Sequence, residues 1–201
     1  YCCSESEFMG DIVFADIIKQ DSKDALKALK KLGIAKTVMM TGDKEEIAKD
    51  IASKAGIDTV YSRLMPDEKA NIVSELQKNG STVVYTGDGI NDAPVLSQAD
   101  VGVAMGGAGS DIAVEASDMV IMGDSLSKLA IGKKVAKKTI RIVHENIIFA
   151  IAVKLLIIIG CAIGIFDENA MWLAVFGDVG VCLIAIANSL RALRVGKIKN
   201  K

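Results

Sequence analysis

The strongest chemical signal in the sequence is the run Thr-Gly-Asp-Gly-Ile-Asn-Asp-Ala-Pro at residues 86–94. It follows residues 82–85, whose apolar character predicts a strand, and ligands of open α/β sheets bind at the carboxyl ends of strands. Asp88 and Asp92 flank glycines that let the backbone turn sharply. Proteins hold Mg²⁺ with one or two carboxylates, and phosphate oxygens complete its shell. The run therefore predicts a magnesium and phosphate site, and the alternative is an acidic turn without a ligand.

Two further motifs could act on the same phosphate. Residues 40–43, Met-Thr-Gly-Asp, lie between an expected strand and an expected helix, where the Thr41 hydroxyl and backbone N–H groups could hold a phosphoryl oxygen. The alternative is a helix cap, for which Thr and Asp are common. Residues 65–69, Met-Pro-Asp-Glu-Lys, place Lys69 in the first turn of a helix, where it could supply a fixed positive charge or be merely solvated. The three motifs in this order are more specific than any one.

Short apolar runs alternate with helical patterns between residues 34 and 122, which is typical of βαβ units. Strands are expected at residues 35–40, 59–61, 82–85, 101–105 and 119–122. Helices are expected at residues 44–55, where Gly56 closes the helix, from Pro66 onward, and near residues 92–98. The predicted fold class is α/β, an open parallel sheet with helices on both faces.

The pattern from residue 125 onward predicts a membrane-associated part of the chain. Residues 125–145 predict an amphipathic lysine-rich stalk helix, and residues 146–166 and 170–189 are apolar runs. A hydrocarbon core needs roughly 20 apolar residues, so the two runs predict a transmembrane hairpin in the lipid bilayer. Basic residues flank the hairpin while its connector is acidic, which places the α/β domain and both chain ends in the cytoplasm of a plasma-membrane protein. The net charge of -1 gives no sign of a nucleic-acid surface.

Each apolar run contains one charged residue, Lys154 in the first and Asp178 in the second. Charges inside membrane segments are costly and commonly functional. We interpret Asp178 as a hard carboxylate ligand for a transported divalent cation and Lys154 as its built-in counter-ion. The alternative is a salt bridge that only fastens the hairpin. Cys182, one turn after Asp178, is either a further thiolate ligand or a small packing residue.

Taken together, the three soluble motifs resemble the phosphorylation domain of heavy-metal-translocating P-type ATPases, which belongs to the haloacid dehalogenase superfamily. The resemblance implies Mg²⁺ and ATP as cofactors. It assigns the Mg²⁺ to Asp88 and Asp92, with Asn91 in support. It also implies that Lys69 neutralises the phosphoryl group, that Thr41 hydrogen-bonds it, and that Gly42 and Asp43 belong to the catalytic site, with Asp43 on its nucleotide and hinge side.

Residues in the two apolar runs indicate which branch of this family the chain resembles. Asp178-Val179-Gly180 on the last helix, with a lysine on the preceding one, is similar to the zinc, cadmium and lead branch of this family. The implied function is ATP-driven export of Zn²⁺, Cd²⁺ or Pb²⁺ through an aspartyl-phosphate cycle. The expected organisation is an irregular start at residues 1–10, the carboxy-terminal part of the phosphorylation domain at 11–124, the stalk and two spans given above, and a basic cytoplasmic tail at 190–201.

This family phosphorylates an aspartate within the sequence Asp-Lys-Thr-Gly-Thr, which the printed sequence does not contain. We therefore expect activity to require an amino-terminal portion of the pump that carries the actuator, the nucleotide-binding domain and earlier membrane helices. The isolated chain is expected to be inactive. One alternative is a non-catalytic membrane fragment that binds metal or a partner pump without turnover. Another is a membrane-tethered phosphatase, which would need a nucleophilic aspartate of its own.

Overall fold

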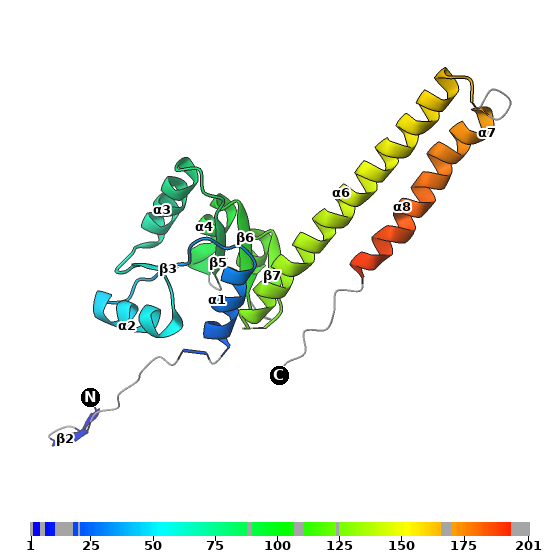
Figure 1. Ribbon diagram of the computed structural model, residues 1–201. Helices are drawn as coiled ribbons and strands as arrows, with labels where there is room; N and C mark the ends of the chain where they lie inside the picture. The colour runs from blue at the N-terminus through cyan, green and yellow to red at the C-terminus, as the bar shows by residue number, and fades with distance from the viewer. Residues whose placement is uncertain are drawn as a thin grey trace. The chain divides into compact units, whose positions relative to one another are not determined.

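The computed structural model describes residues 2–4, 7–10, 18–19, 21–87, 90–106, 111–123, 125–165 and 170–193. Its contacts divide the chain into two compact units, Tyr1–Ser127 and Lys128–Lys201 (Figure 1). The domain boundaries given above stay predictions.

The first unit alternates strands and helices, as the apolar pattern predicts. Its helices are α1 (Ser22–Lys31), α2 (Glu45–Ala55), α3 (Pro66–Lys78), α4 (Ala93–Gln98) and α5 (Asp111–Glu115), with a 3₁₀ turn η1 (Ile90–Asp92). Its parallel strands are β3 (Val38–Met40), β4 (Thr59–Tyr61), β5 (Val84–Gly87), β6 (Val101–Met105) and β7 (Met119–Ile121). The α/β class with parallel strands and flanking helices is thus confirmed. Among the described parallel strands, however, the hydrogen bonds form two sheets, β3-β4 and β5-β6-β7, instead of one.

The short strands are extended by side chains at their amino ends. An aspartate stands immediately before each of β4, β6 and β7 and accepts the backbone N–H of a residue at the start of the neighbouring strand. The pairs are Asp58 with Thr37, Asp100 with Val83, and Asp118 with Gly102, each at an N···O distance of 2.8 Å. We call Asp58, Asp100 and Asp118 the edge aspartates. They explain why β3 and β5 begin later than expected, since Thr37 and Val83 bond to carboxylates before the ladder starts.

Asp58 is the most heavily bonded edge aspartate. Its Oδ2 accepts both the N–H and the hydroxyl of Thr37 at 2.8 Å, and its Oδ1 accepts the Lys30 ammonium at 2.6 Å. The Lys30 hydrogen bond, followed by the Thr37 N–H, holds the pKa of this carboxyl well below its usual range. Lys30 also donates to the Gly56 carbonyl at 3.1 Å. The network therefore ties α1 to the amino ends of β3 and β4.

Close packing of α4 on β6 forms the centre of the unit. Leu96 and Val95 of α4, Val103 of β6 and Val73 of α3 are the largest fully buried side chains. The backbones approach so closely that a Cβ atom on Gly102 would lie 2.3 Å from the Leu96 carbonyl oxygen. Glycine is therefore required there for steric reasons, and it lets α4 rest directly on the strand.

Residues 1–10 differ from expectation. They were predicted to be irregular, but β1 (Cys2–Ser4) and β2 (Glu7–Gly10) pair as an antiparallel hairpin. That prediction is wrong for the described residues. Strands of three and four residues are too short to show the two-residue period by which strands are recognised in a sequence.

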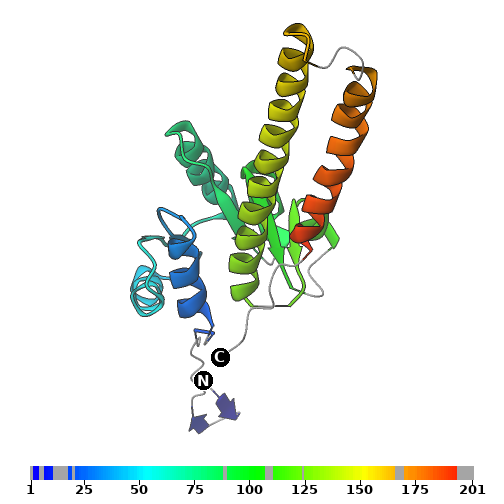
Figure 2. The same cartoon turned by 45° about the vertical axis from the view of Figure 1, so that its right-hand side comes forward.

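The second unit consists of two apolar helical segments that run side by side (Figures 1 and 2). α6 (Ser127–Ala162) is continuous, so the expected stalk and first span form one helix of 36 residues. The second segment contains α7 (Ala170–Val175), the π-helical turn η2 (Phe176–Gly180), α8 (Val181–Ser189) and the 3₁₀ turn η3 (Leu190–Ala192). By length and composition, Ser127–Ala162 and Met171–Ala192 can each cross a membrane.

The less exposed side chains of the two segments recur at spacings of three or four residues, as in a helix–helix seam. They include Asn146, Ala150, Val153, Ile157 and Gly160 on α6, and Leu173, Gly177, Val181, Ala185 and Asn188 on the second segment. Gly177 packs against Ile157, because a Cβ atom there would lie 2.7 Å from the Ile157 Cδ1. Small residues at such seams let membrane helices approach closely.

Replacing Gly102 by alanine should destabilise the first unit, because the added methyl group collides with the Leu96 backbone. Overpacking typically costs about 1–3 kcal/mol. Hydrogen exchange of the β5–β7 amides should accelerate roughly tenfold or more, since about 1.4 kcal/mol corresponds to a factor of ten. Gly42→Ala is the matched control, because its Cβ would meet the Leu64 carbonyl at an ordinary 3.5 Å. Equal exchange rates in both variants would contradict the packing argument.

The Asp58 network predicts a pH dependence of stability. A carboxyl with a lowered folded-state pKa stabilises the fold fully above its unfolded pKa, about 3.9, and this contribution is lost as the pH falls through the folded value. Asp58→Asn should therefore be less stable than the parent at pH 7, and the difference should shrink on acidification below about pH 4. Hydrogen exchange of the β3–β4 amides over this pH range measures the effect. A difference that stays constant with pH would show that the carboxylate charge contributes nothing.

Candidate catalytic and transport sites

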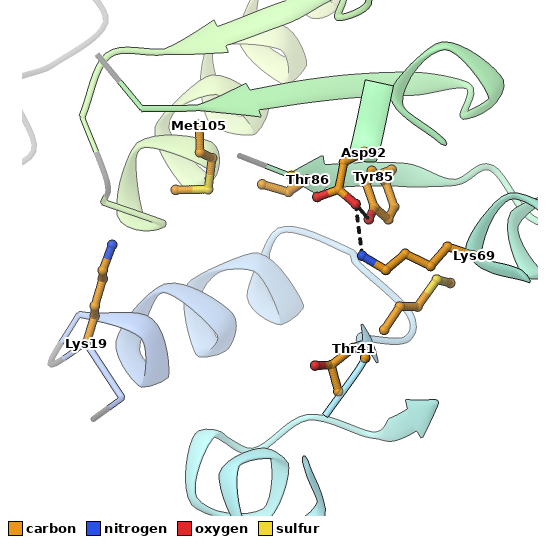
Figure 3. A pocket seen from close by; sticks show the side chains of 10 residues that line it. Lys19, Thr41, Lys69, Tyr85, Thr86, Asp92 and Met105 are labelled. Atoms are coloured by element: carbon orange, nitrogen blue, oxygen red, sulfur yellow. Dashed lines mark hydrogen bonds and ion pairs between the residues drawn. The ribbon is translucent and has the colours of Figure 1, made fainter. Parts of the chain in front are cut away.

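A cavity of about 390 Å³ opens at the carboxyl ends of β3 and β5 (Figure 3). It is lined by Lys19, Met40, Thr41, Gly42, Lys69, Tyr85, Thr86, Gly87, Asp92 and Met105. Four of the sequence-predicted residues therefore meet here, namely Thr41, Gly42, Lys69 and Asp92. They come from both parallel sheets and from α3, so the cavity lies where three βα units converge.

The centre of the cavity wall is a carboxylate that accepts two hydrogen bonds on one oxygen. Asp92 Oδ1 receives the Lys69 ammonium at 2.9 Å and the Tyr85 hydroxyl at 2.9 Å. Figure 3 shows both donors pointing toward Asp92 from different elements. The Lys69 and Asp92 side chains are only 17% and 13% exposed, so their ion pair is largely shielded from water. Such shielding strengthens the attraction relative to a surface pair.

The local backbone structure orients both Lys69 and Asp92. Pro66 opens α3, and the Glu68 carboxylate accepts the Met65 N–H at 2.7 Å, which secures the first turn that carries Lys69. Asp92 is placed by η1 directly after β5. A Cβ atom on Gly87 would lie 2.7 Å from Asp92 Oδ2, so only glycine lets this carboxylate lie against the end of the strand.

Thr41 also lines the cavity, and its hydroxyl is held by Asp43 two residues later. The hydroxyl donates to Asp43 Oδ2 at 2.7 Å and accepts the Asp43 N–H at 3.1 Å. The Thr41 carbonyl in turn accepts the Leu64 N–H at 3.0 Å, which connects the ends of β3 and β4. Asp43 thus contacts the cavity through Thr41 and is absent from its lining.

Two predicted residues fall elsewhere. Asn91 is exposed on η1 and does not line the cavity. Asp88, the predicted principal Mg²⁺ ligand, lies outside the described residues, although Gly87 immediately before it lines the cavity. The catalytic roles of all these residues stay predictions.

In the second unit, the two charges of the apolar runs meet across the helices. Lys154 Nζ lies 2.8 Å from Asp178 Oδ1. Their side chains are 54% and 72% exposed, so the two helices of this hairpin leave the pair accessible. Asp178 lies within the π-helical turn η2, a local geometry found frequently at functional sites.

Cys182 of α8 is exposed and forms no disulfide with any described residue. Within the described ranges, no three or more His, Cys, Asp or Glu side chains cluster in a way that could hold a metal ion. The roles of Asp178 and Cys182 as ligands of a transported cation stay predictions.

Comparison with known proteins identifies the relatives of this arrangement. The cadmium, zinc and cobalt-transporting ATPase of Bacillus subtilis (strain 168) is 46% identical over 200 residues, which cover 98% of this chain and 28% of that protein. The zinc-transporting ATPase of Synechocystis sp. is 44% identical over 189 residues, covering 93% of this chain and 26% of that protein. The chain belongs to the heavy-metal P-type ATPases. It spans about a quarter of the length of these curated relatives.

Two further comparisons agree with this membership. The family description "haloacid dehalogenase-like hydrolase" matches residues 3–100. The crystal structure of a zinc-transporting PIB-type ATPase in its E2.Pi state superposes with a TM-score of 0.81 at 33% identity, over 89% of this chain and 28% of that chain. The heavy-metal P-type ATPase fold therefore includes both the parallel strands and the apolar helices.

Sequence reasoning missed several residues that line the P-type ATPase cavity. Tyr85 immediately precedes the Thr-Gly-Asp-Gly run, and its place on the same strand was a usable signal for contact with that site. Met105 ends β6 at the same edge, so its strand-end position alone could have indicated it, whereas Thr86 belongs to the Thr-Gly-Asp-Gly run itself. Lys19 lies before α1 and carries no motif. Its position in the cavity depends on tertiary structure.

Proposed function

We propose that this chain is part of an ATP-driven exporter of divalent heavy-metal cations, Zn²⁺, Cd²⁺ or Pb²⁺. The first unit supplies the Mg²⁺ and phosphate side of the catalytic site, and the second supplies part of the transport site. The observation that carries the proposal is the Lys154–Asp178 ion pair inside an apolar helical hairpin. Relatives named as cadmium, zinc and cobalt transporters support it.

The cavity of the first unit suits a phosphoryl group beside a hard cation. Carboxylate oxygens are the ligands that Mg²⁺ prefers, and Asp92 offers one in the cavity wall, with Asp88 four residues earlier in the sequence. The Lys69 ammonium is held within the cavity by Asp92, so it is already positioned to neutralise phosphoryl oxygens. Asp92, together with Asp88, would hold the Mg²⁺, and the bound ion would reduce the negative charge of the phosphoryl group.

The chain's own residues would then orient the phosphoryl group. The Thr41 hydroxyl can turn from Asp43 to a phosphoryl oxygen, and Gly42 presents backbone without a side chain at the cavity wall. Asp43 holds Thr41 in place when no phosphate is bound. The phosphorylated aspartate is proposed to come from a part of the pump outside this sequence, together with the actuator and nucleotide-binding portions.

The ion pair explains how the transport site can alternate between metal-bound and metal-free states. Without metal, the Lys154 ammonium neutralises the Asp178 carboxylate at 2.8 Å, which lowers the cost of a charge in the bilayer. A divalent cation that binds Asp178 must displace Lys154, and the return of Lys154 favours release. Because both side chains are exposed in this hairpin, further ligands are supplied by other membrane helices of the pump.

We further propose a position and an orientation for the chain in the membrane. The two apolar segments lie in the lipid bilayer of the plasma membrane, with the α/β unit and both chain ends in the cytoplasm. The basic residues that flank the hairpin support this orientation by the positive-inside rule.

In the full-length pump, Asp178→Ala should lower metal-stimulated ATPase activity at least a hundredfold, because the cation loses its carboxylate ligand. The measurement is ATP hydrolysis with and without Zn²⁺ or Cd²⁺ in reconstituted vesicles. Val179→Ala, an exposed neighbour on the same π-helical turn, is the matched control and should retain stimulation. Undiminished stimulation in Asp178→Ala would remove this residue from the transport site.

Asp88→Asn in the full-length pump should raise the Mg²⁺ concentration needed for phosphoenzyme formation by tenfold or more, since a neutral amide is a weaker ligand than a carboxylate. Phosphoenzyme formed from labelled ATP across a Mg²⁺ titration measures the effect. Asp67→Asn is the control, because Asp67 is an exposed carboxylate in the first turn of α3 outside the cavity lining. A Mg²⁺ curve identical to the parent's would exclude Asp88 as a ligand.

A further inference from the structure

Three polar residues join the two apolar segments at one end of the seam. Asn146 Nδ2 donates to Ser189 Oγ at 3.0 Å and to the Ala185 carbonyl at 3.2 Å. Asn188 Nδ2 donates to Asn146 Oδ1 at 2.8 Å. We call Asn146, Asn188 and Ser189 the asparagine clasp. Nothing in the proposed transport chemistry uses these residues.

The clasp is selective for one alignment of the helices. Asn146 and Asn188 are the polar members of a seam that is otherwise built of small and aliphatic side chains. An amide in such surroundings must keep its hydrogen bonds or bear the cost of desolvation. Sliding one helix by a turn, about 5.4 Å, would separate the two amides and leave both facing aliphatic groups. Apolar seam residues discriminate far less, because they can repack against one another.

The distance between the clasp and the Lys154–Asp178 pair is similar along the two helical segments. Asn146 is eight residues before Lys154, a rise of about 12 Å along an α-helix. Asn188 is ten residues after Asp178, which would be about 15 Å in a regular α-helix. This second stretch includes part of η2, whose wider π-helical turn contains more residues per turn and so shortens the rise. The π-helical turn therefore brings the two distances closer together.

We propose that the asparagine clasp sets the register of the hairpin, and that its members are positioning residues that hold Lys154 against Asp178. The functional consequence rests on the proposed role of this pair in transport, whereas the effect on register does not. Loss of the clasp would let the helices slide or rotate, so that the ammonium no longer reaches the carboxylate.

Register can be measured in this chain in lipid vesicles by electron–electron double resonance. After Cys2, Cys3, Cys161 and Cys182 are replaced by serine, spin labels are attached through Leu156→Cys and Val179→Cys, which are 68% and 58% exposed. The parent should give one narrow distance distribution. Asn146→Leu combined with Asn188→Leu should broaden it or shift it by up to about 5 Å, a helical turn.

Glu145→Gln is the matched control. Glu145 Oε2 accepts a bond from Arg191 Nη1 at 3.0 Å across the same helices, and the same Arg191 atom donates to Asn188 Oδ1 at 2.7 Å, a bond that Glu145→Gln leaves in place. The exposed Glu145–Arg191 ion pair itself contributes little to alignment. Its removal should leave the distance distribution unchanged. A double leucine variant with the parent's distribution would overturn the clasp. If circular dichroism shows that this variant has lost helix, the single variant Asn188→Leu is measured instead. A distance distribution equal to the parent's would then overturn the clasp.

The positioning role is tested in the full-length pump. The double leucine variant should raise the half-maximal Zn²⁺ concentration for ATPase stimulation at least tenfold with a smaller change in kcat, whereas mere destabilisation would lower kcat through loss of active pump. An unchanged metal dependence despite an altered spin-label distance would refute positioning. If Asp178→Ala retained full stimulation, the transport proposal would fail, and the spin-label distances would still decide whether the clasp sets register.

Discussion

The ion pair between Lys69 and Asp92 connects two sheets that share no ladder among the described strands. Lys69 belongs to the helix that follows β4, and Asp92 follows β5, so the contact crosses from one sheet to the other. Removing either partner would leave a largely buried charge unpaired, which is costly. The same two charges line the cavity proposed to bind phosphate. This one contact therefore contributes both to the cohesion of the first unit and to its proposed chemistry.

The second unit uses opposite charges differently. Lys154 and Asp178 are accessible, and their contact can open without loss of a packed core. The alignment that makes the contact possible is maintained elsewhere along the seam, by small residues such as Gly177 and by the hydrogen bonds of Asn146 and Asn188. An ion pair can exchange partners when other contacts hold its two helices together. A pair that also held the helices together could not.

Sequence reasoning recovered the elements whose signals are local. The strands at residues 59–61 and 101–105 were predicted at their observed bounds, and Pro66 correctly marked the start of α3. The division into two sheets, the π-helical turn and the Asn146–Asn188 bond were not predicted, because each depends on residues distant in sequence. In the candidate site, Thr41, Gly42, Lys69 and Asp92 converge as their motifs suggested. Tyr85 was missed because its hydroxyl acquires a role only when Asp92 folds back beside it.

The edge aspartates lie at the amino ends of the strands, whereas the cavity lies at the carboxyl ends. Strands of three to five residues make few ladder bonds, and carboxylates replace some of those that longer strands would provide. The frame of the domain is thus secured on the side away from its chemistry. Evolution or engineering can consequently change the loops at the carboxyl ends of the strands, and with them ligand preference or turnover. The edge aspartates at the amino ends would meanwhile preserve the strand alignment that any such change requires.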